Sequence, residues 1–178
     1  MGLTADHETL VAALRQRGVD WLAPSDAVLG EAVGDQQLIA SLAAHPDPRL
    51  RAALTGLFLL HSQLWVTVEN ASEVLDEAGR HELAARFMAA VYLQRYWRTR
   101  LTAHSDSFVE LPDLFSTSLG LPPADEAFGK PGLYALAEWH KSRTVVPYNR
   151  LAEYNQVAEH VFNALKAKAR TRESALAS

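Results

Sequence analysis

The sequence predicts an all-α protein, folded as a single compact and irregular bundle of about six to seven helices. Apolar residues recur at helical spacing through most of the chain, and no stretch alternates polar and apolar residues for long enough to make a strand. The 178 residues suffice for one well-buried core but are few for two independent cores. We therefore expect one helical domain over residues 1–170 and a frayed basic tail over residues 171–178.

Residues 36–61 predict a helical hairpin, because two apolar-periodic runs are separated by Pro46, Asp47 and Pro48. Asp47 is placed to cap the second helix, and Pro48 to occupy its first turn, where a missing N–H costs nothing. The pair resembles a HEAT-like unit. A solenoid needs several copies at a steady period, and no second copy occurs, so we expect a single bundle.

The other helices follow from the same periodicity. They are expected over residues 4–17, 70–79, 81–102 and 132–141, and from Pro147 onwards. The helix over residues 81–102 is apolar nearly all round, which predicts that it is central and buried by several neighbours. Residues 105–131 are rich in proline and glycine and contain at most a short helix over residues 112–119. Their apolar side chains indicate that this segment packs against the core or carries function.

Composition narrows the class of protein. The chain has no cysteine, which excludes disulfides and thiolate metal sites and suits the cytoplasm. The N-terminus does not read as a signal peptide, and the longest apolar run, residues 87–93, is too short to cross a membrane. Residues 1–80 contain eleven acidic and five basic residues, and residues 81–178 contain ten acidic and twelve basic residues. This balance makes nucleic acid a possible but not a favoured partner.

Catalytic signatures are weak in this sequence. No GxSxG, Walker loop, GxGxxG or HExxH motif is present, so we expect neither a cofactor nor a metal site. The sharpest candidate pair is Arg98 and His104, whose order resembles the ribonuclease motif of helical HEPN domains. The resemblance implies that the histidine handles the proton of a ribose 2′-hydroxyl and the arginine stabilises the phosphate. Six residues apart, the two would face different directions on one helix, whereas Arg100 and His104 would share a face.

The second half of the central helix interleaves aromatic residues with arginines. This pattern is typical of a protein interface or a stacking surface, and also of core packing with arginine stems along the outside. Together with the proline-rich segment that follows, it gives our predicted partner-binding residues, which are Tyr96, Trp97, Arg98, Arg100, Leu114 and Phe115.

Five segments, residues 45–51, 57–61, 111–116, 119–121 and 148–154, resemble an uncharacterised group of bacterial all-helical proteins encoded beside minimal nucleotidyltransferases. The resemblance implies a companion protein in a two-gene module of the toxin–antitoxin type. Our leading hypothesis is therefore a non-enzymatic interaction or regulatory subunit whose partner is another protein, such as a nucleotidyltransferase. A HEPN-like ribonuclease and a small-molecule-binding bundle remain open as alternatives; the second needs a sizeable apolar cavity beside the central helix.

Overall fold

The computed structural model describes residues 5–22, 32–105, 107–146 and 148–177. Within these residues the chain is all-helical, with nine α-helices and two 3₁₀ helices, so the all-α prediction is confirmed, with more helices than the six to seven expected. The elements are α1 (His7–Gln16), α2 (Asp35–Ala44), α3 (Pro48–Leu60), η1 (Ser62–Thr67), α4 (Val68–Glu73), α5 (Glu77–Tyr96), α6 (Arg98–Thr102), α7 (Ser116–Leu119), η2 (Glu126–Gly129), α8 (Lys130–Lys141) and α9 (Arg150–Leu176).

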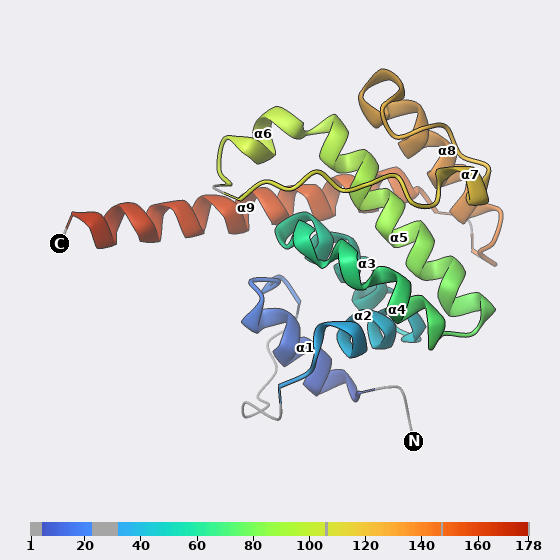
Figure 1. The fold of residues 1–178 in the computed structure, drawn as a ribbon, viewed down its shortest axis with the longest axis horizontal. Helices are drawn as coiled ribbons and strands as arrows, with labels where there is room; N and C mark the ends of the chain where they lie inside the picture. The colour runs from blue at the N-terminus through green and yellow to red at the C-terminus, as the bar shows by residue number, and fades with distance from the viewer. Residues whose placement is uncertain (1–4, 23–31, 106, 147, 178) are drawn as a thin grey trace.

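Helix α5 is the centre of the bundle, as its apolar surface predicts. Every residue from Leu83 to Arg95 is buried, and α2, α3 and α8 pack around the helix (Figure 1). Asp76 begins the helix by accepting a hydrogen bond from the backbone N–H of Gly79 at 2.7 Å. Gly79 therefore lies in the first turn of α5. The prediction that a preceding helix ends at this residue is wrong. The preceding helix, α4, is shorter than expected and ends at Glu73.

Helices α2 and α3 are punctuated as the sequence predicts. Asp47 caps α3 by accepting a hydrogen bond from the N–H of Arg49 at 2.8 Å, and Pro48 is the first helical residue. The two helices contact each other, and both contact α5. The finer likeness of this pair to a HEAT unit stays a prediction.

The predicted helix over residues 81–102 is divided in two. Helix α5 ends at Tyr96, and Trp97 leaves the helical conformation with φ −105° and ψ 20° before α6 begins. Neither glycine nor proline marks this break, so local sequence rules do not locate it. The break redirects the chain, so that α6 lies near the middle of α9 in Figure 1.

Helix α9 is the longest element and contacts α3, α5 and α8. The expected start of the last helix at Pro147 lies outside the described residues; Asn149 caps α9 through the N–H of Leu151. The helix continues through residue 170, where the sequence predicted the domain to end, and reaches Leu176. Its final turns project past the rest of the molecule (Figure 1), and none of residues 166–177 is buried. Across the described residues, no helix has the length and apolar content needed to cross a membrane.

Candidate functional site

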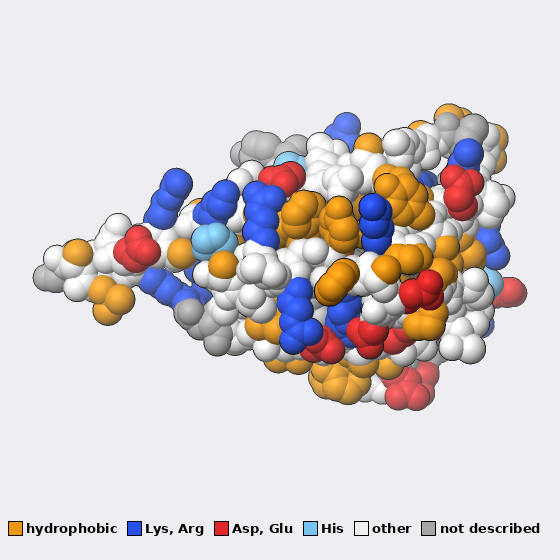
Figure 2. Space-filling model, turned by 90° about the horizontal axis from the view of Figure 1, so that it is seen from above, with side chains coloured by type: hydrophobic (Ala, Val, Ile, Leu, Met, Phe, Trp, Pro, Cys, Tyr) orange, Lys and Arg blue, Asp and Glu red, His pale blue; other side chains and the backbone are white. Residues whose placement is uncertain are grey.

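The predicted arginine–aromatic residues lie where α5 gives way to α6. Figure 2 views this side of the molecule and shows hydrophobic side chains gathered between Lys and Arg side chains. The ring of Trp97 packs edge-on against Phe162 of α9. Arg100 lies 3.8 Å above the centre of the Phe162 ring and donates a hydrogen bond to Glu159 at 2.9 Å. Tyr96 is partly exposed and packs against Trp97. These contacts attach α6 to α9, so much of the patch already has a structural role.

Arg98 and His104 occupy opposite ends of α6. Arg98 is the first residue of that helix, and His104 lies beyond its last residue. The guanidinium of Arg98 donates to Glu110 at 2.7 Å and lies 5.8 Å from the centre of the Phe108 ring. A phosphate would therefore compete with Glu110 for this arginine.

Residues 109–111 precede the other two predicted contact residues, Leu114 and Phe115. Side chains of α5 hold the backbone of residues 109–111 in place. The side-chain amide of Gln94 donates to the Val109 carbonyl at 2.8 Å and accepts from the Leu111 N–H at 2.7 Å. Arg95 donates to the Leu111 carbonyl at 2.8 Å. These hydrogen bonds satisfy backbone groups that lie outside any helix. They also fix the path of the chain as it leads to Leu114 and Phe115.

Leu114 and Phe115 lie on one wall of a groove beside α4, which we term the α4 groove. It has a volume of about 540 Å³ and is lined by Trp65, Val66, Val68, Glu69, Ser72, Glu73, Arg80, Leu114 and Phe115. Val66 is 60% exposed and Leu114 is 42% exposed, so apolar surface faces solvent here. The ring of Phe115 is held in place because it packs edge-on against Phe87 of α5 at 5.8 Å. The groove thus combines one aromatic side chain held by the core with exposed apolar side chains.

Charge on and beside the α4 groove is mainly negative. The exposed carboxylates of Glu69 and Glu73 line it, and those of Asp76 and Glu77 follow along the chain. Among the described residues these four carboxylates form no ion pair. Arg80 is the basic residue of the lining, and its guanidinium donates to a backbone carbonyl at 2.8 Å. The groove therefore presents unneutralised acidic groups beside exposed apolar side chains.

A second polar constellation, which the sequence analysis missed, lies between α3, α5 and α9. Arg86 of α5 is only 1% exposed, donates to Glu82 at 2.8 Å, and forms an ion pair with Glu153 of α9. Arg51 of α3 also contacts Glu82, at 3.2 Å, and Arg150 donates to the second oxygen of Glu153 at 2.7 Å. We term these five residues the buried ion network. It contains three cations and two anions.

His140 of α8 lies beside this network. Its Nδ1 atom is hydrogen-bonded to the hydroxyl of Tyr154, and its Nε2 atom is buried with no partner among the described residues. Burial, and then the nearby charge of Arg86, lower the pKa of His140 to about 3, so the ring is neutral at pH 7. Burial also raises the pKa of Tyr154.

The buried ion network is built for charge pairing and not for proton transfer. Burial is the largest influence and would raise the pKa of Glu82 and of Glu153, but the charge and hydrogen bond of Arg86, together with their other charged and hydrogen-bonding neighbours, lower both pKa values. A general acid at neutral pH needs the opposite shift. Local spacing carried a signal for this cluster: Glu82 and Arg86 are four residues apart, within a helix predicted to be buried on all sides.

No group of three or more His, Asp or Glu side chains suited to a metal ion occurs within the part of the chain that the structure describes. Comparisons of the chain with protein-family models, curated proteins and solved structures found no match. Functional inference therefore depends on the geometry of this molecule.

Proposed function

We propose that this chain is a non-enzymatic interaction subunit that binds a basic, amphipathic helix of a partner protein in the α4 groove. The observation that carries the proposal is the pairing of exposed apolar side chains with unneutralised carboxylates in one groove. An amphipathic helix can place its apolar face on Val66, Leu114 and Phe115. Its Lys or Arg residues would then lie beside Glu69 and Glu73, which favours encounter and orientation.

The resemblance of the sequence to companions of minimal nucleotidyltransferases suggests the first partner to test. A nucleotidyltransferase that carries a basic amphipathic helix would suit the groove. The regulatory or positioning effect on that enzyme is part of the same proposal and rests on the resemblance alone.

Two valine variants make a matched test. Val66→Asp places a charge in the groove, whereas Val145→Asp places the same charge on a fully exposed valine outside the groove lining. Both side chains are exposed, so circular dichroism and thermal melting should show little change. Affinity purification from the native cell should recover a stoichiometric partner with the wild type and with Val145→Asp, and lose it with Val66→Asp.

Salt dependence separates this proposal from purely apolar docking. Glu69→Gln with Glu73→Gln should weaken the complex and reduce its sensitivity to ionic strength. The proposal is wrong if the wild type recovers no stoichiometric protein, or if Val66→Asp retains the same partner as Val145→Asp.

A further inference from the structure

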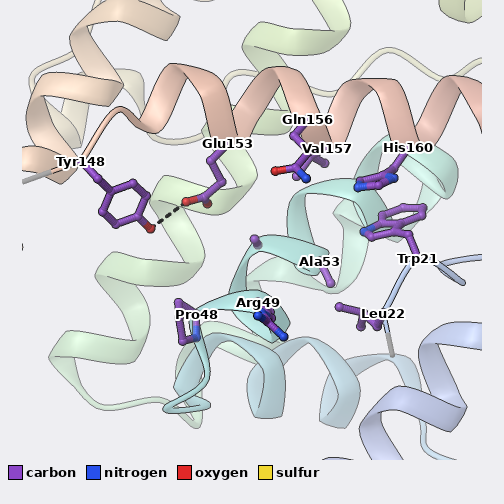
Figure 3. A pocket seen from close by; sticks show the side chains of 11 residues that line it. Trp21, Leu22, Pro48, Arg49, Ala53, Tyr148, Glu153, Gln156, Val157 and His160 are labelled. Carbon is purple, nitrogen blue, oxygen red and sulfur yellow. Dashed lines mark hydrogen bonds between the residues drawn. The ribbon is translucent and has the colours of Figure 1, made fainter. Parts of the chain in front are cut away.

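A second hollow lies on another part of the molecule, between α3 and α9. This α3–α9 pocket has a volume of about 410 Å³, which falls in the range of small-molecule sites. Figure 3 shows its lining, which consists of Trp21, Leu22, Pro48, Arg49, Ala52, Ala53, Tyr148, Glu153, Gln156, Val157 and His160. No residue of α4 takes part, so this pocket is distinct from the α4 groove.

One wall of the pocket is aromatic and flat. The indole of Trp21 stacks on the imidazole of His160, with the ring centres 5.2 Å apart and the planes 4° from parallel. Gly56 of α3 leaves room for the indole in this place, because a β-carbon at that position would lie 2.6 Å from Trp21 Cζ2. Small or aliphatic side chains, including Ala53 and Val157, line the space beside the rings (Figure 3). This wall suits a flat apolar ring system.

The opposite end of the pocket touches the buried ion network through Glu153. One oxygen of this carboxylate is paired with Arg86, and the other accepts hydrogen bonds from Tyr148 at 2.8 Å and from Arg150 at 2.7 Å. Two buried guanidinium groups thus compensate its charge. Glu153 is therefore a poor receptor for a cationic ligand.

Arg49 is the positive group that the lining leaves available. It is exposed at the first turn of α3, and among the described residues its guanidinium has neither an ion-pair partner nor a side-chain hydrogen bond. The buried ion network adds a further excess of one positive charge behind Glu153. A guanidinium binds a carboxylate or phosphate by two parallel charge-assisted hydrogen bonds.

We propose that the α3–α9 pocket binds a small, flat aromatic anion, with its ring against the wall formed by Trp21 and His160 and its anionic group on Arg49. The site is separate from the α4 groove, so it adds a ligand-binding activity to the proposed interaction role. Gln156, which lies between the two ends of the pocket in Figure 3, supplies an amide that can assist the anionic group.

Three naphthalene probes of matched shape test the proposal by isothermal titration calorimetry of the full chain. They are 1-naphthaleneacetate, 1-naphthylmethanol and 1-naphthylmethylammonium, which are anionic, neutral and cationic at pH 7. The anion should bind about tenfold more tightly than the alcohol, as one charge-assisted contact provides. The cation should bind no better than the alcohol.

Substitutions assign the binding to this pocket. Arg49→Gln should remove the preference for the anion and leave binding of the alcohol unchanged, whereas Arg170→Gln, at an exposed arginine of α9 outside the pocket, should have no effect. Trp21→Leu should weaken all three probes. Because Trp21 also packs on α3, the melting temperature of the Trp21→Leu variant is measured as well, to show that the variant is folded. Equal binding of the three probes, absence of binding at millimolar concentration, or an anion preference that survives Arg49→Gln would overturn the proposal.

Discussion

Gly132 of α8 lies directly against the ring of Tyr92 of α5. A β-carbon at Gly132 would lie 2.0 Å from Tyr92 Cε1, a distance that no relaxed structure tolerates. The Tyr92 hydroxyl is itself fixed by a hydrogen bond to the Pro122 carbonyl at 2.7 Å, so the ring cannot move away freely. This contact sets how closely the two helices approach.

Gly132→Ala should therefore lower the free energy of unfolding by about 2–3 kcal/mol, because the added methyl group overpacks a fixed interface. Urea denaturation measures the loss. Gly34→Ala is the control, since a β-carbon there meets no atom within 4 Å, and it should cost less than about 1 kcal/mol. In a Tyr92→Leu background the cost of Gly132→Ala should shrink; an unchanged cost would show that the ring is not the obstacle.

Arg86→Met should destabilise the protein by about 3 kcal/mol, because it leaves the carboxylates of Glu82 and Glu153 in a largely buried site without their main cation. Arg98→Met removes an exposed ion pair with Glu110 and should cost less than about 1 kcal/mol. Equilibrium unfolding in urea compares the two.

The same Arg86→Met change should cost less in a protein that already carries Glu82→Gln and Glu153→Gln, since the stranded charges are then absent. If the cost is equal in both backgrounds, the arginine stabilises the fold by packing and not by pairing.

Acid should destabilise the protein through His140. Its folded-state pKa of about 3 lies below the value of 6.5 for an unperturbed histidine, so the unfolded chain takes up the proton first. The contribution of the neutral His140 to the free energy of unfolding is thus fully present above pH 6.5, and it falls as the pH drops toward 3. Between pH 6.5 and 4.5 this group alone should cost about 2–3 kcal/mol.

His140→Gln should flatten the stability profile between pH 6.5 and 4.5, because glutamine keeps a polar partner for Tyr154 but does not titrate. The exposed residue His81, changed to Gln, should keep the steep profile. Below pH 4.5 the carboxyls of Glu82 and Glu153, whose pKa values are lowered beside Arg86, add a further loss in every variant. A parallel profile for His140→Gln and the wild type would contradict this account.

Gln94→Leu should release the segment that precedes the α4 groove. The variant loses both hydrogen bonds to residues 109 and 111, and it leaves a buried N–H without a partner, at a cost of about 2 kcal/mol. Hydrogen–deuterium exchange should quicken at Leu111 more than in α3. Uniform quickening across the bundle would indicate global destabilisation instead of local release.

Local sequence rules located much of the fold because they describe interactions within one turn of the chain. Asp47 and Pro48 begin α3 as expected, since a cap needs only its neighbours. The helix expected over residues 70–79 was wrong in its bounds, because α4 covers Val68–Glu73 and Asp76, which accepts a hydrogen bond from the N–H of Gly79, begins α5. The break at Trp97 was missed, because the contacts of Arg100 with Phe162 and Glu159 on α9 come from residues about sixty positions away.

The candidate sites show the same division. Leu114 and Phe115 were predicted from their apolar character in an irregular segment, and they do line a groove. The pairing of Arg86 with Glu153 was missed because the two residues are 67 positions apart and only the folded chain brings them together. The pocket between α3 and α9 combines Trp21, Arg49 and His160, which no spacing rule connects.

Helix α9 also has a consequence for biosynthesis. It is synthesised after every helix that it covers, and it supplies Glu153, the partner of Arg86. Until it emerges from the ribosome, the nascent chain displays the uncovered sides of α3 and α8 together with an arginine that lacks one of its two carboxylates. The bundle can therefore close only after translation of α9, and a nascent chain arrested before residue 150 is a natural target for chaperones or proteases.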